Sequence, residues 1–199
     1  MKNQQEPITA ELISQLKSKI KGKVISPSDA SYDETRKIYN AMIDKRPGAF
    51  AICTNVHDVK AAVDFGRDNN LLVAIRGGGH NGGGLGLCDG GLVIDLSRLK
   101  SISVNTENNT VKVGGGCIWN EVDNATHEHG LAIPSGMVSS TGVGGLTLGG
   151  GVGYLARKYG LTIDNLLEAE MVLADGSIVT TNKNKHSDLF WAIRGGGGN

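Results

Sequence analysis

Glycines gather in four clusters along the chain, and each cluster lies beside a segment with the pattern of regular structure. The clusters fall within residues 77–91, 114–116, 142–153 and 195–198. Glycine supplies 30 of the 199 residues, without a collagen-like period and with only four prolines. Glycine is favoured where the backbone takes positive φ or approaches another group closely. The clustering indicates binding loops between helices and strands, although a tight turn alone would explain any single cluster.

The first half of the chain predicts helices followed by a β-α-β unit. Apolar residues at helical spacing predict a helix over residues 8–20, and residues 31–43 offer a second short helix. A strand is expected over 49–54, an amphipathic helix over 56–69 and a buried strand over 71–75. The last of these strands runs directly into the first glycine cluster.

The second half predicts a mixture of strands and helices. Strands are expected over 91–97, 101–105 and 110–115, and a polar turn suits a hairpin between the last two. A helix is expected over 118–130, with Gly130 at its end. Further on, residues 140–160 hold too many glycines for regular structure and end in a short helical pattern.

Two short signals predict elements near the end of the chain. Asp175-Gly176 predicts a two-residue hairpin turn between two strands. Ser187 is placed to cap a final helix. The chain then ends inside a glycine run, an unusual place for a folded protein to finish, which predicts a fragment.

The order of elements predicts an α+β fold with two lobes facing each other across the glycine loops. We expect a helical lead-in over 1–34, a small α/β lobe over 35–97, and a larger lobe over 98–199 with a mixed or antiparallel sheet and helices.

Charge and composition argue against several classes of partner. Lys+Arg and Asp+Glu balance at 20 each, so neither nucleic acid nor an anionic membrane is an expected partner. The N-terminal segment has no signal-peptide pattern, and no apolar stretch approaches the roughly 18 to 20 residues that span a bilayer. We therefore expect a cytoplasmic protein. The composition gives no basis for an oligomeric state.

The three cysteines predict reduced, structural thiols and no metal site. They are widely spaced and form no zinc-binding pair. Cys88 lies in a glycine-rich loop, so a reactive thiol is an alternative, but a small buried side chain is favoured.

The first glycine cluster predicts an anion-binding loop. Gly77, Gly78 and Gly79 follow a strand directly, so successive N–H groups can curl round a pyrophosphate. The loop lacks the lysine of a Walker motif, and it leads into a strand where a Rossmann fingerprint opens a helix. Arg76 either adds charge to the loop or forms a salt bridge at the strand end. On pattern alone His80 is more often a hydrogen-bonded loop residue than a reactive one.

Several motifs in order resemble the berberine bridge enzyme-like FAD-linked oxidases of the vanillyl-alcohol oxidase/PCMH superfamily. They are RGGGHN (76–81), LVIDLSRLKSI (92–102), GLAIPSG (130–136), TGVGGLTLGGGVGYLARKYGLTIDNL (141–166), LADGSIVT (173–180) and SDLFWAIRGGGGN (187–199). The resemblance covers about residues 35–199 and implies a two-lobed PCMH-type FAD-binding fold.

The resemblance implies that FAD is the cofactor and that His80 bonds covalently to the flavin 8α-methyl group. Val138 occupies the position where many members place a second, cysteinyl linkage, so a single histidyl linkage is expected. The implied cofactor-binding residues are Arg76, Gly77, Gly78, Gly79, His80, Asn81, Gly136, Ser140, Thr141, Gly144, Gly145, Gly149, Gly150, Gly153 and Val179.

The resemblance also implies the type of reaction. We expect oxidation of an alcohol or sugar-like small molecule by hydride transfer to FAD, with reoxidation by O2 or another acceptor. Thr141 matches a position that influences oxygen access, so oxidase and dehydrogenase behaviour both stay open. The catalytic base and the substrate-binding domain are expected in a C-terminal half absent here, so no catalytic residue is assigned. The alternatives are a noncovalent FAD reductase of the same fold and a flavin-binding module without catalysis.

Overall fold

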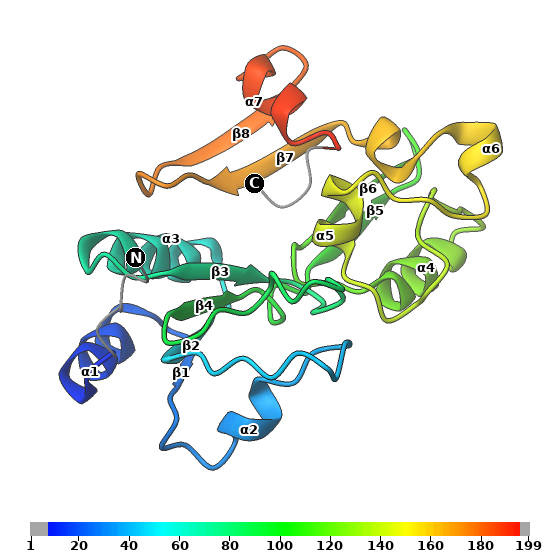
Figure 1. Cartoon of the computed structure of the whole chain (residues 1–199). Coiled ribbons are helices and arrows are strands. Elements are labelled where there is room, and N and C mark those ends of the chain that lie inside the picture. The colour runs from blue at the N-terminus through cyan, green and yellow to red at the C-terminus, as the bar shows by residue number, and fades with distance from the viewer. Residues whose placement is uncertain (1–7, 196–199) are drawn as a thin grey trace. The chain divides into compact units, whose positions relative to one another are not determined.

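A four-stranded sheet in the order β1-β2-β4-β3 organises the first part of the computed structural model, which describes residues 8–195 (Figure 1). The strands are β1 Lys23–Ile25, β2 Ala49–Ile52, β3 Val73–Arg76 and β4 Leu92–Asp95. β4 is parallel to both β2 and β3, whereas β1 is antiparallel to β2. Helix α3, Val56–Asp68, connects β2 to β3 and confirms the predicted β-α-β unit. The sequence patterns did not predict β1.

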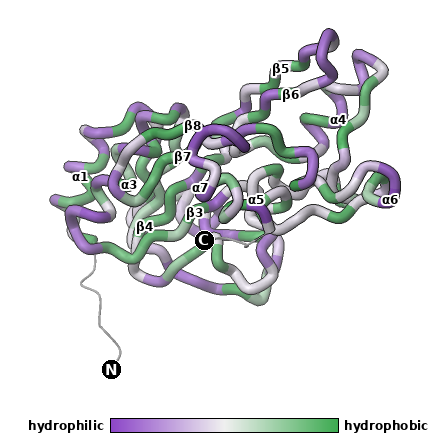
Figure 2. The backbone as a smooth tube through the Cα atoms, turned by 90° about the horizontal axis from the view of Figure 1, so that it is seen from above, coloured by the Kyte–Doolittle hydropathy of each residue, from purple (hydrophilic) through white to green (hydrophobic). Residues whose placement is uncertain are grey.

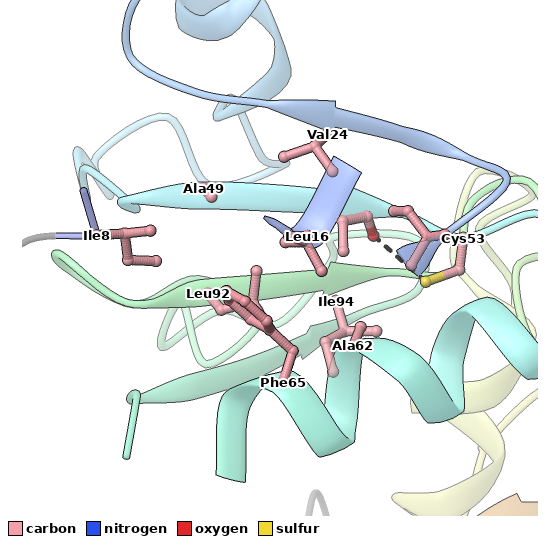
Figure 3. Packing of buried hydrophobic residues seen from close by; sticks show 11 residues of the cluster. Ile8, Leu16, Val24, Ala49, Cys53, Ala62, Phe65, Leu92 and Ile94 are labelled. Atoms are coloured by element: carbon pink, nitrogen blue, oxygen red, sulfur yellow. Dashed lines mark hydrogen bonds between the residues drawn. The ribbon is translucent and has the colours of Figure 1, made fainter. Parts of the chain in front are cut away.

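Two amphipathic helices bury their apolar faces against this sheet. Helix α1, Ala10–Lys19, begins after Thr9, whose side chain accepts a hydrogen bond from the Leu12 N–H. Leu16 of α1 and Phe65 of α3 are fully buried and join Leu92 and Ile94 of β4 in one cluster (Figure 3). Figure 2 shows hydrophobic and hydrophilic stretches alternating along both helices, as a single buried face requires.

Strand β3 is less buried than its apolar sequence predicts. Ala74 and Arg76 are buried, but Val73 is 37% and Ile75 51% exposed. β3 lies at one end of the strand order, so it has a neighbouring strand on one side only within this sheet. An uninterrupted apolar run does not distinguish such an edge strand from a central one.

The helix expected over residues 31–43 is wrong beyond its first turn. Helix α2 covers only Tyr32–Thr35, and residues 36–46 have an irregular path. The physical reason lies in the backbone hydrogen bonds. The Tyr39 N–H, for example, donates to the carbonyl of Gly79 at 3.1 Å and not to a carbonyl four residues earlier.

A predicted hairpin and helix open the second part of the chain. β5, Ile102–Asn105, pairs antiparallel with β6, Thr110–Val113, which confirms the hairpin. Helix α4, Trp119–His127, follows. Buried Cys117, Trp119 and Val122 form the core of this region.

The glycine-rich stretch contains more helix than expected. α5 covers Val143–Leu148, α6 covers Ala156–Tyr159 and a 3-10 helix, η1, covers Thr162–Asn165. The prediction that glycine excludes regular structure is therefore wrong for α5, where the hydroxyl of Thr147 also donates to the Val143 carbonyl at 2.7 Å.

Two terminal predictions need correction in detail. β7, Glu168–Val172, and β8, Ile178–Asn182, form the expected two-stranded sheet. The Leu173 N–H donates to the Ser177 carbonyl at 2.9 Å, so the turn holds three residues between these partners, where two were predicted. Helix α7 is Ser187–Ala192, and its N-cap is His186, with φ of 46°, so Ser187 is the first helical residue and not the cap. Residues 196–199 of the last glycine cluster lie outside the described residues.

The described chain divides into two units by its contacts. The first unit runs to Arg98 and includes Val172–Ile178, and the second contains Leu99–Met171 and the residues from Val179 onward. Among residues 8–195, no helix combines the length and apolar character needed to cross a bilayer.

All three cysteines are buried free thiols. Burial raises the pKa of Cys53 to about 12 and that of Cys88 to about 11. Cys88 is 5% exposed and packs in a cluster with Val93 and Ala74. This supports the structural interpretation of Cys88 over the reactive one.

A buried carboxylate ties three segments of the first unit together. Asp58 of α3 is 2% exposed and accepts hydrogen bonds from the N–H groups of Lys21 at 2.8 Å, Gly22 at 3.1 Å and Thr54 at 2.9 Å. The Thr54 hydroxyl donates to it as well, at 2.8 Å. Burial alone would raise the pKa of this carboxyl, but the hydrogen bonds from Thr54 and Lys21 together hold the pKa below its usual value.

We expect Asp58→Asn to lower the free energy of unfolding by about 3 kcal/mol at pH 7, because an amide leaves buried donors without an acceptor. The carboxylate has a lowered pKa in the folded state, so its contribution is complete above the unfolded pKa of about 3.9 and is lost as the pH falls through the folded value. Urea unfolding between pH 7 and pH 3 measures both effects. Asp68→Asn, at the exposed last residue of α3, is the control and should change stability by less than about 0.5 kcal/mol. Equal losses in the two variants would contradict this role for Asp58.

Candidate functional site

The first glycine loop, residues 77–91, leaves the sheet where β3 ends and returns to it at β4. Arg76, the last residue of β3, lies opposite Asp95 in the parallel register, and its Nε donates to Asp95 Oδ2 at 2.5 Å. Its Nη1 donates to the Thr35 carbonyl at 2.6 Å, and the guanidinium lies 4.8 Å from the centre of the Phe50 ring. The salt bridge that is one of the two alternatives for Arg76 is present at the strand end. The contact of Arg76 with a cofactor stays a prediction.

One side of the loop is covered by residues 36–46, which we call the docking segment. The Tyr39 N–H donates to the Gly79 carbonyl at 3.1 Å, and Asn40 Nδ2 donates to the Gly82 carbonyl at 2.9 Å. Lys45 Nζ donates to the carbonyl of Gly84 at 2.8 Å and to that of Leu87 at 3.0 Å. These bonds use loop carbonyls. They fix the loop without consuming the N–H groups that an anion would need.

The glycines of this loop serve two different purposes. Gly84 has φ of 70°, and a Cβ atom there would lie 2.7 Å from Cγ2 of Ile43, so this glycine is required by the docking segment itself. A Cβ atom at Gly82 would meet nothing within 4 Å. Gly78, Gly82 and Gly83 are exposed. The packing of the chain therefore explains Gly84 and leaves the exposed glycines available for a ligand.

His80 and Asn81 complete this part of the site. The His80 ring is half-buried and stacks on Tyr39, with ring centroids 4.2 Å apart and planes 18° apart. Asn81 Oδ1 accepts from the Leu85 N–H at 3.0 Å, which stabilises the turn that follows. The structure thus brings Arg76, Gly77, Gly78, Gly79, His80 and Asn81 together on one loop.

Sequence patterns gave no signal for the docking segment. Tyr39 and Asn40 lie in a stretch expected to be helical, and Lys45 lies two residues beyond it. Their contacts with the loop join residues about 40 positions apart. Asp95 is different, because a single carboxylate inside the apolar run LVIDL already calls for a buried partner.

The second group of predicted residues belongs to the second unit, within α5 and on the loops that flank it. Gly136 and Gly153 lie against each other, since a Cβ atom at Gly153 would be 1.6 Å from the Ser135 carbonyl oxygen and 3.7 Å from the Gly136 Cα. These two glycines allow the segments before and after α5 to cross at backbone distance. Gly150, after the helix, has φ of 106°.

The entrance to α5 is held by backbone hydrogen bonds. The Thr141 carbonyl accepts from the Trp119 N–H at 3.0 Å, and the Thr141 N–H donates to the Val138 carbonyl at 3.1 Å. Ser140 is exposed, as are Gly145 and Gly149, whereas Gly144 is half-buried. A Cβ atom at Gly145 would meet nothing within 4 Å. Backbone on this face of α5 is therefore open to a flat ligand.

Two further predicted positions differ from these in their setting. Val138, at the position expected for a second linkage, is 50% exposed. Val179 lies in β8 and is half-buried. Val179 is thus on a separate element from the loops around α5.

The residues of the first unit fit the pyrophosphate and flavin attachment that the motifs imply. The loop is fixed from one side through its carbonyls, its exposed glycines leave backbone accessible, and the half-buried His80 lies between Gly78 and Gly82 in the chain. A Cβ atom at any exposed glycine would reduce that access.

Comparisons with known proteins identify the family of this chain. Residues 47–182 match the family model described as FAD binding domain. The chain is 39% identical over 180 residues to (R)-6-hydroxynicotine oxidase of Paenarthrobacter nicotinovorans. This alignment covers 90% of this chain and 39% of that protein.

Two solved structures show the same fold. BBE-like 1 of Physcomitrella patens has a TM-score of 0.87 and 36% identity, covering 92% of this chain and 40% of that one. Glucooligosaccharide oxidase of Acremonium strictum, described with 6-S-cysteinyl, 8α-N1-histidyl FAD, has a TM-score of 0.84 and 36% identity, covering 88% of this chain and 38% of that one.

The chain spans about two fifths of the length of these relatives. Within that span the matched residues include both glycine loops and the predicted two-stranded hairpin. The two-lobed FAD-binding fold and the choice of FAD as cofactor are confirmed by these matches. The chain therefore belongs to the FAD binding domain family, among the berberine bridge enzyme-like FAD-linked oxidoreductases.

Proposed function

We propose that this chain holds FAD for an oxidoreductase that oxidises an alcohol or a sugar-like small molecule, with the flavin linked covalently through His80. The observation that carries the proposal is the position of His80, which directly follows Gly77, Gly78 and Gly79 in a loop whose other side is fixed by the docking segment. When bound, FAD supplies a hydride acceptor that O2 or another oxidant regenerates.

The chain's own residues have distinct parts in this proposal. The N–H groups of Gly77, Gly78 and Gly79 bind the pyrophosphate, because successive backbone donors suit an anion. Arg76 fixes the start of this loop through Asp95. The exposed backbone around α5, at Ser140 and Gly145, contributes further contacts to the cofactor.

We propose a single linkage, since Val138 has no nucleophilic atom and the three cysteines are buried. Such a bond holds the cofactor without the entropy cost of binding a free molecule. The glucooligosaccharide oxidase described above carries both a cysteinyl and a histidyl bond, so this chain is proposed to differ from it.

We also retain three broader expectations as proposals. The chain is cytoplasmic, its substrate is a small molecule and not a nucleic acid, and its two lobes divide near residues 97 and 98. The balanced charge of 20 basic and 20 acidic residues supports the second of these.

We expect His80→Ala to abolish flavin fluorescence in the denatured protein band, because only a covalent bond survives denaturation. The measurement is a denaturing gel of the purified protein viewed under ultraviolet light, with flavin absorbance of the native protein recorded in parallel. His129→Ala, at an exposed histidine outside the loop, is the matched control and should keep the fluorescent band. Fluorescence that persists in His80→Ala would reject His80 as the linkage. A wild-type protein that binds FAD without a fluorescent band would favour the noncovalent alternative.

Substitutions at two glycines of the same loop should separate cofactor binding from folding. Gly78 is exposed, so Gly78→Val should lower bound FAD by about tenfold or more while leaving the melting temperature of the cofactor-free protein unchanged, since one lost charge-assisted contact is worth about 1.5 to 3 kcal/mol. Gly84→Ala should instead lower that melting temperature, because its Cβ atom meets Ile43 and φ is positive. FAD content follows from absorbance, and stability from thermal unfolding. Unchanged FAD content in Gly78→Val would contradict the pyrophosphate assignment.

A further inference from the structure

We propose that Tyr39 is a positioning residue for His80, whose ring holds the imidazole in the plane from which a ring nitrogen bonds to the flavin. This inference rests on the proposed function, because the linkage gives the positioning its purpose. It assigns a role to a residue that lies outside every motif considered above. Three observations carry it.

The first observation is the geometry of the two rings. Their centroids are 4.2 Å apart and their planes are inclined by 18°, which is a stacked arrangement. Tyr39 is 69% exposed, so its ring is not part of a hydrophobic core. Burial of apolar area therefore does not explain why the Tyr39 ring lies over His80.

The second observation is that the backbone on both sides of His80 is tied to the same segment. The Tyr39 N–H donates to the carbonyl of Gly79, the residue directly before His80. The side chain of the next residue, Asn40, donates to the carbonyl of Gly82. The stack is thus one of three contacts that join residues 39–40 to residues 79–82.

The third observation is that a side chain joins the two ends of the docking segment. Arg36 pairs with Asp33 at 2.8 Å and also with Asp44, which lies eight residues further along the chain. The Arg36 side chain is 16% exposed. The ends of the segment that carries Tyr39 are therefore held together by the chain itself.

Stacking and bond formation use different parts of the imidazole. Tyr39 contacts the face of the ring, whereas the nitrogens lie at its edge, so the stack restricts the plane of the ring without occupying the bonding position. Formation of the linkage breaks one C–H bond of the 8α-methyl group and the imidazole N–H bond and forms the C–N bond. The two electrons and two protons released pass to the flavin ring system, from which O2 removes them as hydrogen peroxide. Restricting one torsion of the attacking group favours such a step.

The test compares three variants of the cofactor-free protein. Tyr39→Ala removes the ring, Tyr39→Phe keeps a stacking ring without the hydroxyl, and Met42→Ala alters a 91% exposed residue of the same segment. The first readout needs no flavin. It is the chemical shift of the His80 ring protons by NMR, assigned by their absence in His80→Ala. We expect an upfield ring-current shift in the wild type, Tyr39→Phe and Met42→Ala, and its loss in Tyr39→Ala.

The second readout is the rate at which each protein, mixed with FAD in air, gains a fluorescent band on a denaturing gel. We expect Tyr39→Ala to be about two- to tenfold slower, in line with the strength of an aromatic pair, and Tyr39→Phe and Met42→Ala to match the wild type. Circular dichroism checks that each variant is folded. Tyr39→Leu, which keeps an apolar side chain without a stacking ring, replaces Tyr39→Ala if that variant does not fold.

The outcomes separate this inference from the proposed function. If the wild type gains covalent flavin and Tyr39→Ala gains it equally fast, His80 linkage stands and positioning by Tyr39 is rejected. An unchanged His80 chemical shift in Tyr39→Ala rejects the stack itself. If the wild type binds FAD but never gains a fluorescent band, the linkage is rejected and the positioning role falls with it.

Discussion

The buried ion pair between Arg76 and Asp95 fixes where the first glycine loop begins. Both residues lie at the carboxyl ends of neighbouring parallel strands, and their register places them opposite each other. Removing either partner would leave a buried charge uncompensated, which is strongly destabilising in general. Arg76 also reaches the Thr35 carbonyl, so the same guanidinium sets the start of the segment that docks on the loop. The exposed glycines and His80 take their positions from this arrangement.

The glycines of this loop are subject to different physical constraints. Gly84 is needed because Ile43 lies where a side chain would be, whereas Gly82 faces open space. A high glycine content therefore does not by itself measure how much of a loop contacts a ligand. In the second unit the same distinction separates Gly153, which passes a carbonyl oxygen at backbone distance, from Gly145 on the open face of α5.

Sequence patterns predicted the features that depend on local spacing. The β-α-β unit around α3, the β5–β6 hairpin and helix α4 follow from periodicity and turn residues, and the order of the glycine motifs identified the family. The patterns failed where distant contacts decide the structure. Residues 36–46 remain irregular because their donors bond to a loop about 40 residues away, and β3 is half exposed because of its place in the strand order. Tyr39 could not be connected with His80 for the same reason.

Because the three thiols are buried, their reaction with a thiol reagent can measure local unfolding of the chain. Cys53 and Cys88 belong to the first unit and Cys117 to the second, and all three are buried in the folded state. A thiol reagent therefore labels each cysteine only when the structure around it opens. The rates at which the separate cysteines are labelled report the local stability of each unit independently, without an added probe and without reference to the flavin.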